Sequence, residues 1–298
     1  MKILHILYQS TPNSAGSSIR SRDVVASQLS LGLKPIVITS PFQEPLVTGK
    51  KKEFIEGVTY YRTFSGESNE VVSEKRTGLF RQIRKAIRFF SFTVSIYKIA
   101  KAEKIDLLHA HAMFFCAFSS KIVSFLLKKP LLYEVRSLWE ERYKGKNFFL
   151  NIIFGAITFI ETSAMFFSNE VIAINKNLKY ELKSRFLLRK KEIHIVENAV
   201  NLKRISINKS NRIEKVFAYI GTISPIEGLE LLVNVFKNLH SRGIKNKLVF
   251  YGDGVMLSEL KILAKGDDLI EFRGSFSQDN IAKVYSEIDI VINPRKKS

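Results

Sequence analysis

Cysteine and acidic residues are scarce in this sequence. Its single cysteine, Cys116, excludes an internal disulfide framework and fits a reducing compartment, where we expect it to be a small buried hydrophobic residue. Only 28 Asp and Glu stand against 47 Lys and Arg, which leaves a formal net charge of +19. Such an excess favours polyanionic partners, among them nucleic acid, anionic lipid head groups and nucleotide or lipid diphosphates. Charge by itself does not choose among them.

Long apolar runs are also few. Residues 1–7 are too short for a signal peptide and lack a small-residue cleavage site, so they predict a buried first strand. Residues 148–167 approach the ~20 apolar residues that a membrane span needs. This segment includes Asn151 and Glu161, and a carboxylate at mid-membrane depth is costly. We therefore expect a buried or interfacial helix there rather than a membrane span.

Strand and helix patterns alternate along the chain, which predicts an α/β protein with parallel sheets. The expected strands are residues 2–7, 35–39, 105–110, 131–135, 170–174, 193–196, 215–220, 247–251, 269–272 and 289–293, with a β-type excursion at 53–62. The expected helices are residues 20–31, 76–104, 113–128, 148–167, 228–239, 255–264 and 278–286.

A polar, basic stretch at residues 202–211 interrupts this alternation and predicts a linker between two domains, residues 1–201 and 202–298. After it come only four expected strands, whereas a doubly wound nucleotide-binding sheet has about six. We therefore expect the second domain to be incomplete. Nowhere do His, Cys and carboxylates show the sequence spacing of a zinc site, so we expect no metal and no cofactor.

Short motifs recur in the turns that follow the expected strands. In the first half they are Gly16-Ser17-Ser18, the D-x-x-H-x-H sequence of residues 106–111, the Y-E-V-R-x-x-W-E sequence of residues 133–140, and Glu197-Asn198-Ala199-Val200-Asn201. In the second half they are Gly221-Thr222, Glu227-Gly228, Gly252-Asp253-Gly254 and Arg273-Gly274. Each is weak alone, but their order and spacing resemble glycosyltransferase family 4, retaining enzymes of the GT-B fold. The closest look-alikes act in bacterial surface polysaccharide and exopolysaccharide assembly.

The resemblance implies two facing Rossmann-like, doubly wound domains, the second incomplete, with the acceptor on the first and a nucleotide-sugar donor on the second. It also implies that the chemical step needs no bound metal. The donor-binding candidates are Gly221, Thr222, Glu227, Gly228, Gly252, Asp253, Gly254, Arg273 and Arg295. The acceptor-binding candidates are Gly16, Ser17, Ser18, Arg20, Arg136 and Glu140. Without the resemblance the glycines are ordinary βα turns, and Arg136 and Glu140 equally predict an ion pair that shapes a loop.

One histidine is the catalytic candidate. His111 lies just past the carboxyl end of an expected parallel strand, where ligands bind in open α/β sheets, and the resemblance implies that it contacts the donor sugar. A hydrogen-bonded turn histidine is the alternative. We expect the neighbouring His109 to point the other way along the strand.

The sequence also departs from the family pattern. Thr222 and Glu227 stand where many members have the Arg and Lys that hold the donor diphosphate, so those cations are unassigned and Arg273 and Arg295 are the replacement candidates. The family's E-x7-E element, which would begin shortly after Arg295, is absent from the sequence.

Residues 76–104 predict a basic amphipathic helix. Its apolar stripe consists of Leu79, Ile83, Ala86, Ile87, Phe90, Val94 and Tyr97, and its adjacent basic face of Arg81, Arg84, Lys85 and Arg88. Such a helix can lie at an anionic membrane surface, or it can pack on the core with a solvated basic face. Because no RNA or DNA module is recognisable, we expect no nucleic-acid partner.

The resulting expectation is a cytoplasmic retaining glycosyltransferase, peripheral on the inner face of the cell membrane. It would move a sugar from a nucleotide-diphosphate donor to a lipid-linked or polysaccharide acceptor in bacterial capsule, lipopolysaccharide or exopolysaccharide synthesis. Two alternatives stay open: a truncated, inactive remnant that binds only nucleotide or membrane, and a nucleotide-sugar epimerase of the same architecture.

Overall fold

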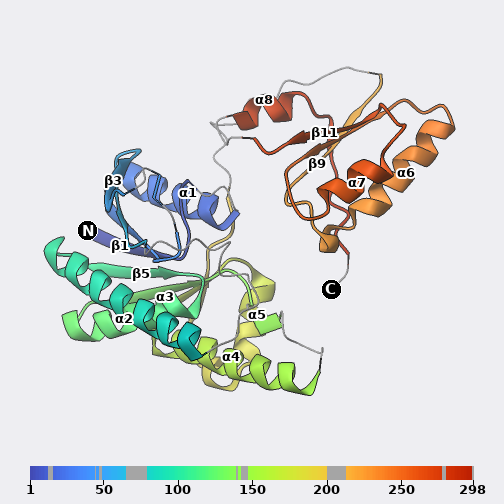
Figure 1. Ribbon diagram of the computed structural model, residues 1–298. Coiled ribbons are helices and arrows are strands. Elements are labelled where there is room, and N and C mark those ends of the chain that lie inside the picture. The colour runs from blue at the N-terminus through green and yellow to red at the C-terminus, as the bar shows by residue number, and fades with distance from the viewer. Residues whose placement is uncertain are drawn as a thin grey trace. The chain divides into compact units, whose positions relative to one another are not determined.

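The structure of the protein is a computed structural model, which describes residues 1–12, 16–43, 45–46, 49–64, 79–138, 140–141, 147–199, 213–276 and 280–296. At residues 79–86 and 149 it describes the backbone alone. Contacts divide the chain into two compact units, Met1–Val200 and Asn201–Ser298, and each unit is described below by itself (Figure 1). The predicted linker at 202–211 and the motif residue Trp139 lie outside the described residues.

Unit 1 is an α/β unit built on an eight-stranded sheet in the order β3-β4-β2-β1-β5-β6-β7-β8, parallel except for the β3–β4 hairpin. Its strands are β1 (Lys2–Leu7), β2 (Lys34–Thr39), β3 (Lys52–Ile55), β4 (Val58–Arg62), β5 (Leu107–His111), β6 (Leu131–Val135), β7 (Glu170–Ala173) and β8 (Ile193–Ile195). Its helices are α1 (Gly16–Ser30), α2 (Leu79–Ala102), α3 (Phe114–Leu127), α4 (Phe148–Phe167), α5 (Lys176–Ser184) and the short η3 (Phe186–Leu188).

The strands of unit 1 are buried on both faces, as parallel strands covered by helices must be. In β1, Leu4 and Ile6 belong to the large core cluster that also holds residues of α2, α3 and α4. Leu7 belongs to the opposite cluster with Val25 of α1. Figure 1 shows α2, α3 and α4 together on one face of the sheet and α1 on the other. Because side chains alternate along a strand, His5 of β1 lies on the α1 face.

Unit 2 is a four-stranded parallel sheet in the order β11-β10-β9-β12. Its strands are β9 (Val216–Ile220), β10 (Lys247–Tyr251), β11 (Ile270–Gly274) and β12 (Ile290–Val291). Its helices are η5 (Pro225–Glu227), α6 (Leu229–Ser241), α7 (Leu257–Leu263) and α8 (Ile281–Ser286). One core cluster packs α6 and α7 on the sheet, and a second packs Val284 of α8 on the other side. The four strands expected from the sequence are the four found.

Most expected elements are present with ends shifted by a few residues, and the β-type excursion at 53–62 is the antiparallel hairpin β3–β4. The sequence did not predict α5. This short helix is mostly polar, buries only Leu178 and Leu182, and begins where the Asn175 side chain accepts a hydrogen bond from Leu178 N–H. Cys116 is fully buried, as expected.

Candidate functional site

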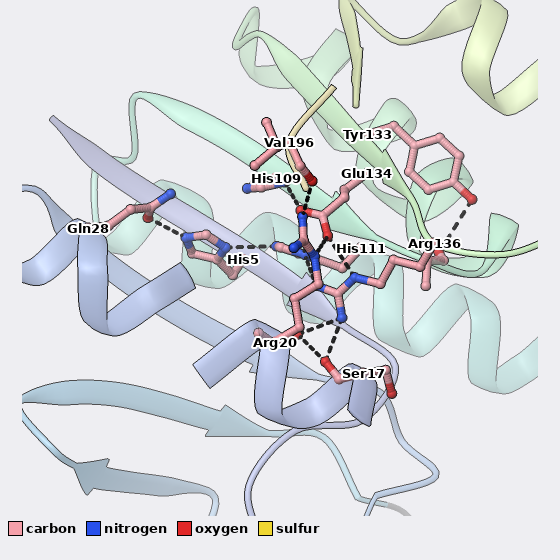
Figure 2. A network of polar contacts seen from close by, with 12 residues as sticks. His5, Ser17, Arg20, Gln28, His109, His111, Tyr133, Glu134, Arg136 and Val196 are labelled. Carbon is pink, nitrogen blue, oxygen red and sulfur yellow. Dashed lines mark hydrogen bonds and ion pairs between the residues drawn. The ribbon is translucent and has the colours of Figure 1, made fainter. Parts of the chain in front are cut away.

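A cluster of buried histidines lies at the centre of the unit 1 sheet, on the α1 face. His5 of β1 pairs in register with His109 of the neighbouring strand β5, which also carries His111. The rings of His109 and His111 stack with centroids 3.9 Å apart (Figure 2). The expectation that His109 points away from His111 is therefore wrong. Residues two apart in a strand share a face, so both rings lie on the side of His5.

Glu134 of β6 lies at the centre of this cluster. Its Oε1 accepts hydrogen bonds from Arg20 Nε at 2.8 Å and from Arg136 Nε at 2.7 Å. Its Oε2 lies 3.5 Å from His109 Nε2 and 3.6 Å from His111 Nδ1. Burial would raise the pKa of this carboxyl, but the contacts with His109, His111 and Arg136 hold the pKa well below its usual range. Glu134 is therefore a permanent buried anion.

The donor and the acceptor of each hydrogen bond around His111 can be assigned. Arg136 Nη2 can only donate, so His111 Nδ1, 2.7 Å away, accepts and the His111 proton resides on Nε2. That N–H donates to His5 Nδ1 at 2.8 Å, and His5 Nε2–H then donates to Gln28 Oε1 at 2.8 Å. Burial lowers the pKa of His5 to about 3 and that of His111 well below its usual value. Both rings are thus neutral, with defined tautomers.

Ligand atoms of His5, His109 and His111 lie within 4.8 Å of one another, so these residues could hold a metal ion by geometry. Their separation along the chain gave no such indication. Metal binding at His111 Nε2 would place a proton on Nδ1, against the N–H of Arg136. The metal and the Arg136 contact therefore exclude one another. Among the described residues, both ring nitrogens of His109 have no hydrogen-bond partner.

The two arginines connect the cluster to the first turns of α1 and to the segment after β8. Arg136 Nη1 donates to Ser17 O at 2.6 Å and to Ser21 Oγ at 2.9 Å, both in the first turns of α1. Arg20 donates to backbone or side-chain oxygens of Val196, Glu197 and Asn198, the segment that follows β8.

The acceptor-side candidates are only partly brought together. Ser17, Arg20 and Arg136 meet His111 around Glu134, and Ser18 is buried beside them in the first turn of α1, which Gly16 begins. Glu140 does not join them: it is buried in an ion pair with Arg185, which also donates to Thr162 Oγ1. The sequence offered an Arg136–Glu140 ion pair that shapes a loop as the alternative to acceptor binding. Glu140 does form an ion pair, but with Arg185.

A second buried carboxylate, which sequence reasoning missed as a site residue, supports the turn after β5. Ala112 and Met113 both have positive φ, of 47° and 40°. Glu161 of α4 accepts a hydrogen bond from the N–H of Phe114, the first residue of α3, and another from Tyr133 Oη at 2.9 Å. Burial raises the pKa of Glu161 to about 7. Such a turn at the carboxyl end of a parallel strand is a common position for ligand contacts.

In unit 2 the two glycine turns touch backbone to backbone. A Cβ on Gly252, where φ is 143°, would lie 1.8 Å from Gly221 O, and a Cβ on Gly254 would lie 2.2 Å from Ile223 O. Gly221 N–H donates to Tyr251 O at 3.0 Å. Only glycine permits this approach, so packing alone accounts for Gly252 and Gly254. The result is a narrow, rigid pair of turns at the carboxyl ends of β9 and β10.

Other donor-side candidates surround these turns. Gly228, with φ of 70°, precedes the first residue of α6, and a Cβ there would lie 2.9 Å from Pro294 O. The exposed Thr222 and Asp253 lie within the turns, and Glu227 ends η5.

The two candidate cations differ in their contacts. Arg273 donates to Glu271, Glu287 and Tyr251 Oη, so its charge is already compensated by two carboxylates. Arg295 is exposed near the end of the described chain.

Comparison with known sequence families decides the assignment. The sequence model of Glycosyltransferase Family 4 matches residues 24–204, and that of Glycosyl transferases group 1 matches residues 214–298. The chain belongs to glycosyltransferase family 4. The boundary between the two matches falls in the same region as the division between units 1 and 2.

Curated relatives of this family 4 chain are distant. The capsular polysaccharide biosynthesis glycosyltransferase CapM of Staphylococcus aureus is 26% identical over 145 residues, 44% of this chain and 37% of CapM. An uncharacterized glycosyltransferase of Methanocaldococcus jannaschii is 24% identical over 212 residues, 66% of this chain and 53% of the relative. The chain thus spans about a third to a half of the curated relatives it matches.

Solved structures show the same fold, that of the GT-B glycosyltransferases. Sucrose-phosphate synthase from Thermosynechococcus elongatus superposes with a TM-score of 0.72 at 14% identity, over 99% of this chain and 76% of that chain. HepE of Anabaena, in complex with UDP, gives 0.64 at 14% identity, with coverage of 98% and 73%. WaaG, involved in lipopolysaccharide biosynthesis, gives 0.63 at 11% identity, with coverage of 98% and 75%.

Proposed function

We propose that this protein is a retaining glycosyltransferase that transfers a sugar from a nucleoside-diphosphate donor to a lipid-linked or polysaccharide acceptor in bacterial surface glycan synthesis. The observation that carries the proposal is the pair of family matches, in order, over nearly the whole chain. Relatives named for capsular polysaccharide and lipopolysaccharide biosynthesis support the surface-glycan assignment. A cytoplasmic location follows from the use of a nucleotide-activated donor.

We assign the donor to the paired turns of unit 2. Structural neighbours that are described with UDP or with UDP-2-fluoro glucose support a nucleotide donor. Gly228 precedes the amino terminus of α6, whose unpaired N–H groups and dipole favour a diphosphate. Arg295 is the better candidate for the missing cation, because Arg273 is already held by two carboxylates.

We assign the acceptor to unit 1, at the first turn of α1 with Gly16, Ser17 and Ser18. Arg20 and Arg136 would act by holding this turn rather than by contacting the acceptor, because Glu134 and backbone oxygens occupy their N–H groups. His111 is neutral and its two ring nitrogens are engaged by Arg136 and His5. It therefore cannot serve as a general base near neutral pH, and we propose that it holds the carboxyl end of β5 in place rather than reacting itself.

A lipid-linked acceptor would require the enzyme to reach a membrane, and we propose peripheral contact through residues 76–104. Of the predicted apolar stripe, Ile87 and Phe90 are exposed, whereas Phe92, Ile96 and Ala100 form the core-facing side of α2. Two exposed apolar residues next to a basic sequence favour the membrane alternative over simple core packing. The structure does not describe the side chains of the stripe and basic residues that precede position 87, which are Leu79, Arg81, Ile83, Arg84, Lys85 and Ala86.

A thermal-shift screen of the purified chain against UDP-, GDP-, ADP- and TDP-sugars tests the donor assignment. A ligand at 100 times its Kd stabilises the folded state by about 2.7 kcal/mol. We expect one nucleotide class to give a clear shift that the Arg295→Gln variant reduces and the Arg273→Gln variant keeps. No shift with any nucleotide would favour the inactive remnant. A shift with interconversion of the sugar but no transfer would favour the epimerase.

A further inference from the structure

His109 is a buried histidine that lacks hydrogen bonds among the described residues. It is 3% exposed, and neither of its ring nitrogens has a partner. A buried polar group in this state loses the interactions that it would have with water, so a partner of its own is expected there. Ligand atoms of His5, His109 and His111 lie within 4.8 Å of one another, and all three rings are buried. An ion held by the three rings would supply the missing partner.

The groups around the three rings match the outer partners of a metal site. A histidine that binds a metal through one ring nitrogen usually donates its other N–H to a carboxylate, a carbonyl or water. His5 Nε2–H already donates to the side-chain carbonyl of Gln28 at 2.8 Å, which leaves the Nδ1 lone pair directed toward His111 (Figure 2). Glu134 Oε2 lies 3.6 Å from His111 Nδ1 and 3.5 Å from His109 Nε2, so this carboxylate can accept from both rings.

Little movement is needed for His5 and His111 to share an ion. His5 Nδ1 and His111 Nε2 lie 2.8 Å apart. Two nitrogens that each bind a tetrahedral ion at about 2.0–2.1 Å lie about 3.4 Å from one another. The pair therefore has to separate by about 0.6 Å, which small rotations of the two side chains can provide. His109 completes the set, because its ring centroid lies 3.9 Å from that of His111 and 5.0 Å from that of His5.

Arg136 competes with such an ion for His111. Metal binding at His111 Nε2 moves the ring proton to Nδ1, the atom that otherwise accepts a hydrogen bond from Arg136 Nη2 at 2.7 Å. Because two N–H groups cannot bond to each other, Arg136 has to withdraw from His111 when the ion binds. The Nδ1–H group can then donate to Glu134 Oε2 instead. The cluster thus has two exclusive states, one closed by the guanidinium and one by the metal.

The ligand atoms select the class of ion. Imidazole nitrogens suit zinc, copper, iron and nickel, whereas magnesium and calcium prefer oxygen ligands. Three histidines with a fourth position left open are a known arrangement for Zn²⁺. Glu134, a buried anion beside two of the rings, partly compensates the charge that such an ion brings. Co²⁺ takes the same geometry as Zn²⁺ and absorbs visible light, which makes it the more convenient probe.

We propose that His5, His109 and His111 form a binding site for one transition-metal ion of the zinc class. The site stands on the three rings and their partners, without the proposed function. Its occupancy is coupled to the first turn of α1, because Arg136 Nη1 donates to Ser17 O at 2.6 Å and the ion displaces Arg136 from His111. Only the view that this coupling lets the ion regulate acceptor binding rests on the proposed function.

Metal analysis of the untagged full chain tests this inference without nucleotide or sugar. Because the rings are buried, a bound ion should exchange slowly, so the chain is produced in cells grown with added Co²⁺ and separated from loose metal by gel filtration. Atomic emission should find about one Co²⁺ per chain, with the visible absorption of a tetrahedral ion. His109→Gln should lose this ion. His194→Gln is the matched control and should keep it, because the His194 side chain is 48% exposed and pairs with Glu170 outside the cluster.

Two further variants should shift the metal affinity in opposite directions, measured by competition with a chromophoric chelator. Gln28→Leu removes the acceptor of His5 Nε2–H and should weaken binding by about 10–100-fold. Arg136→Met removes the competing N–H group and should tighten binding by about fivefold or more. General damage to the fold cannot produce a gain in affinity, so these two variants decide the matter even where His109→Gln does not fold.

Any of three results would overturn the inference, each with circular dichroism showing a folded chain. The first is a wild-type chain that holds no stoichiometric metal. The second is an ion that His109→Gln retains or His194→Gln loses, which indicates an adventitious ion only. The third is unchanged binding by Gln28→Leu, or unchanged or weaker binding by Arg136→Met. Loss of the metal site leaves the donor assignment standing, and a nucleotide screen without any shift leaves the metal site standing.

Discussion

Replacement of Glu134 by Gln should destabilise unit 1 strongly. The carboxylate is 2% exposed and bonds to Arg20 and Arg136, whose side chains are 10% and 9% exposed. Removing one partner of a buried ion pair costs about 3–5 kcal/mol, because the remaining charge stays buried without compensation. Glutamine keeps one acceptor oxygen, so we expect a loss of about 3 kcal/mol in the free energy of unfolding.

Urea unfolding followed by tryptophan fluorescence measures this loss in the correct unit. The only tryptophan of the chain, Trp139, belongs to unit 1, so its signal does not report on unit 2. Glu170→Gln is the matched control: Glu170 pairs with His194 at 3.0 Å, but its side chain is 57% exposed. An exposed pair contributes at most about 1 kcal/mol, so this variant should unfold close to the wild type.

A second substitution tests the cause. If uncompensated positive charge is responsible, Glu134→Gln/Arg136→Gln should be no less stable than Glu134→Gln alone, with a coupling energy of about 1–3 kcal/mol. The reasoning is refuted if Glu134→Gln costs no more than Glu170→Gln. It is also refuted if the two substitutions at 134 and 136 are simply additive.

Three further outcomes are expected. The pKa of Glu161 is raised from 4.5 to about 7, so its contribution to the free energy of unfolding falls as pH rises through this window, and in urea titrations the wild type should lose about 3 kcal/mol relative to Glu161→Gln between pH 4.5 and 7. The pKa of His5 is lowered from 6.5 to about 3, so its contribution has the opposite sign and falls as pH drops below 6.5, and the wild type should lose about 2 kcal/mol relative to His5→Gln on going from neutral pH to pH 5. Gly252→Ala should lower the stability of unit 2 by about 3 kcal/mol or more, because the new Cβ would meet Gly221 O; hydrogen exchange in β9 and β10 measures this loss. Gly155→Ala is the control: its Cβ would lie in open space on α4, so it should stabilise unit 1 by about 0.5–1 kcal/mol.

Much of the fold could be predicted because its signals are local. The strands 2–7, 131–135 and 247–251 and the helix 148–167 have the predicted bounds, since each is a mainly apolar segment between polar turns. The helix α5 was missed because two buried leucines in nine residues make too weak a pattern. The antiparallel pairing of β3 with β4 was not predicted, because the type of the turn between them could not be recognised from the sequence.

The candidate site was predicted only in part. The turn glycines and His111 lie at the ends of their strands, as expected from chain order. His5 was missed because it is separated from His111 by 106 residues, and only the parallel pairing of β1 with β5 brings the rings together. The error on His109 has a different origin, because the two-residue period of a strand already places it beside His111.

By itself the sequence determined the alternation of strands and helices, the two βαβ series and the family, because hydrophobic period, turn glycines and motif order are properties of neighbouring residues. Only the tertiary structure decided what the charged groups do. Arg20 and Arg136 can be recognised as cations from the sequence, but only the fold pairs them with Glu134. In that pairing they hold the first turn of α1 in place. Likewise α4 is apolar by composition, yet packing alone decided that Glu161 is buried while Phe148 faces outward. Burial and pairing are set by segments far apart along the chain, and no local pattern contains them.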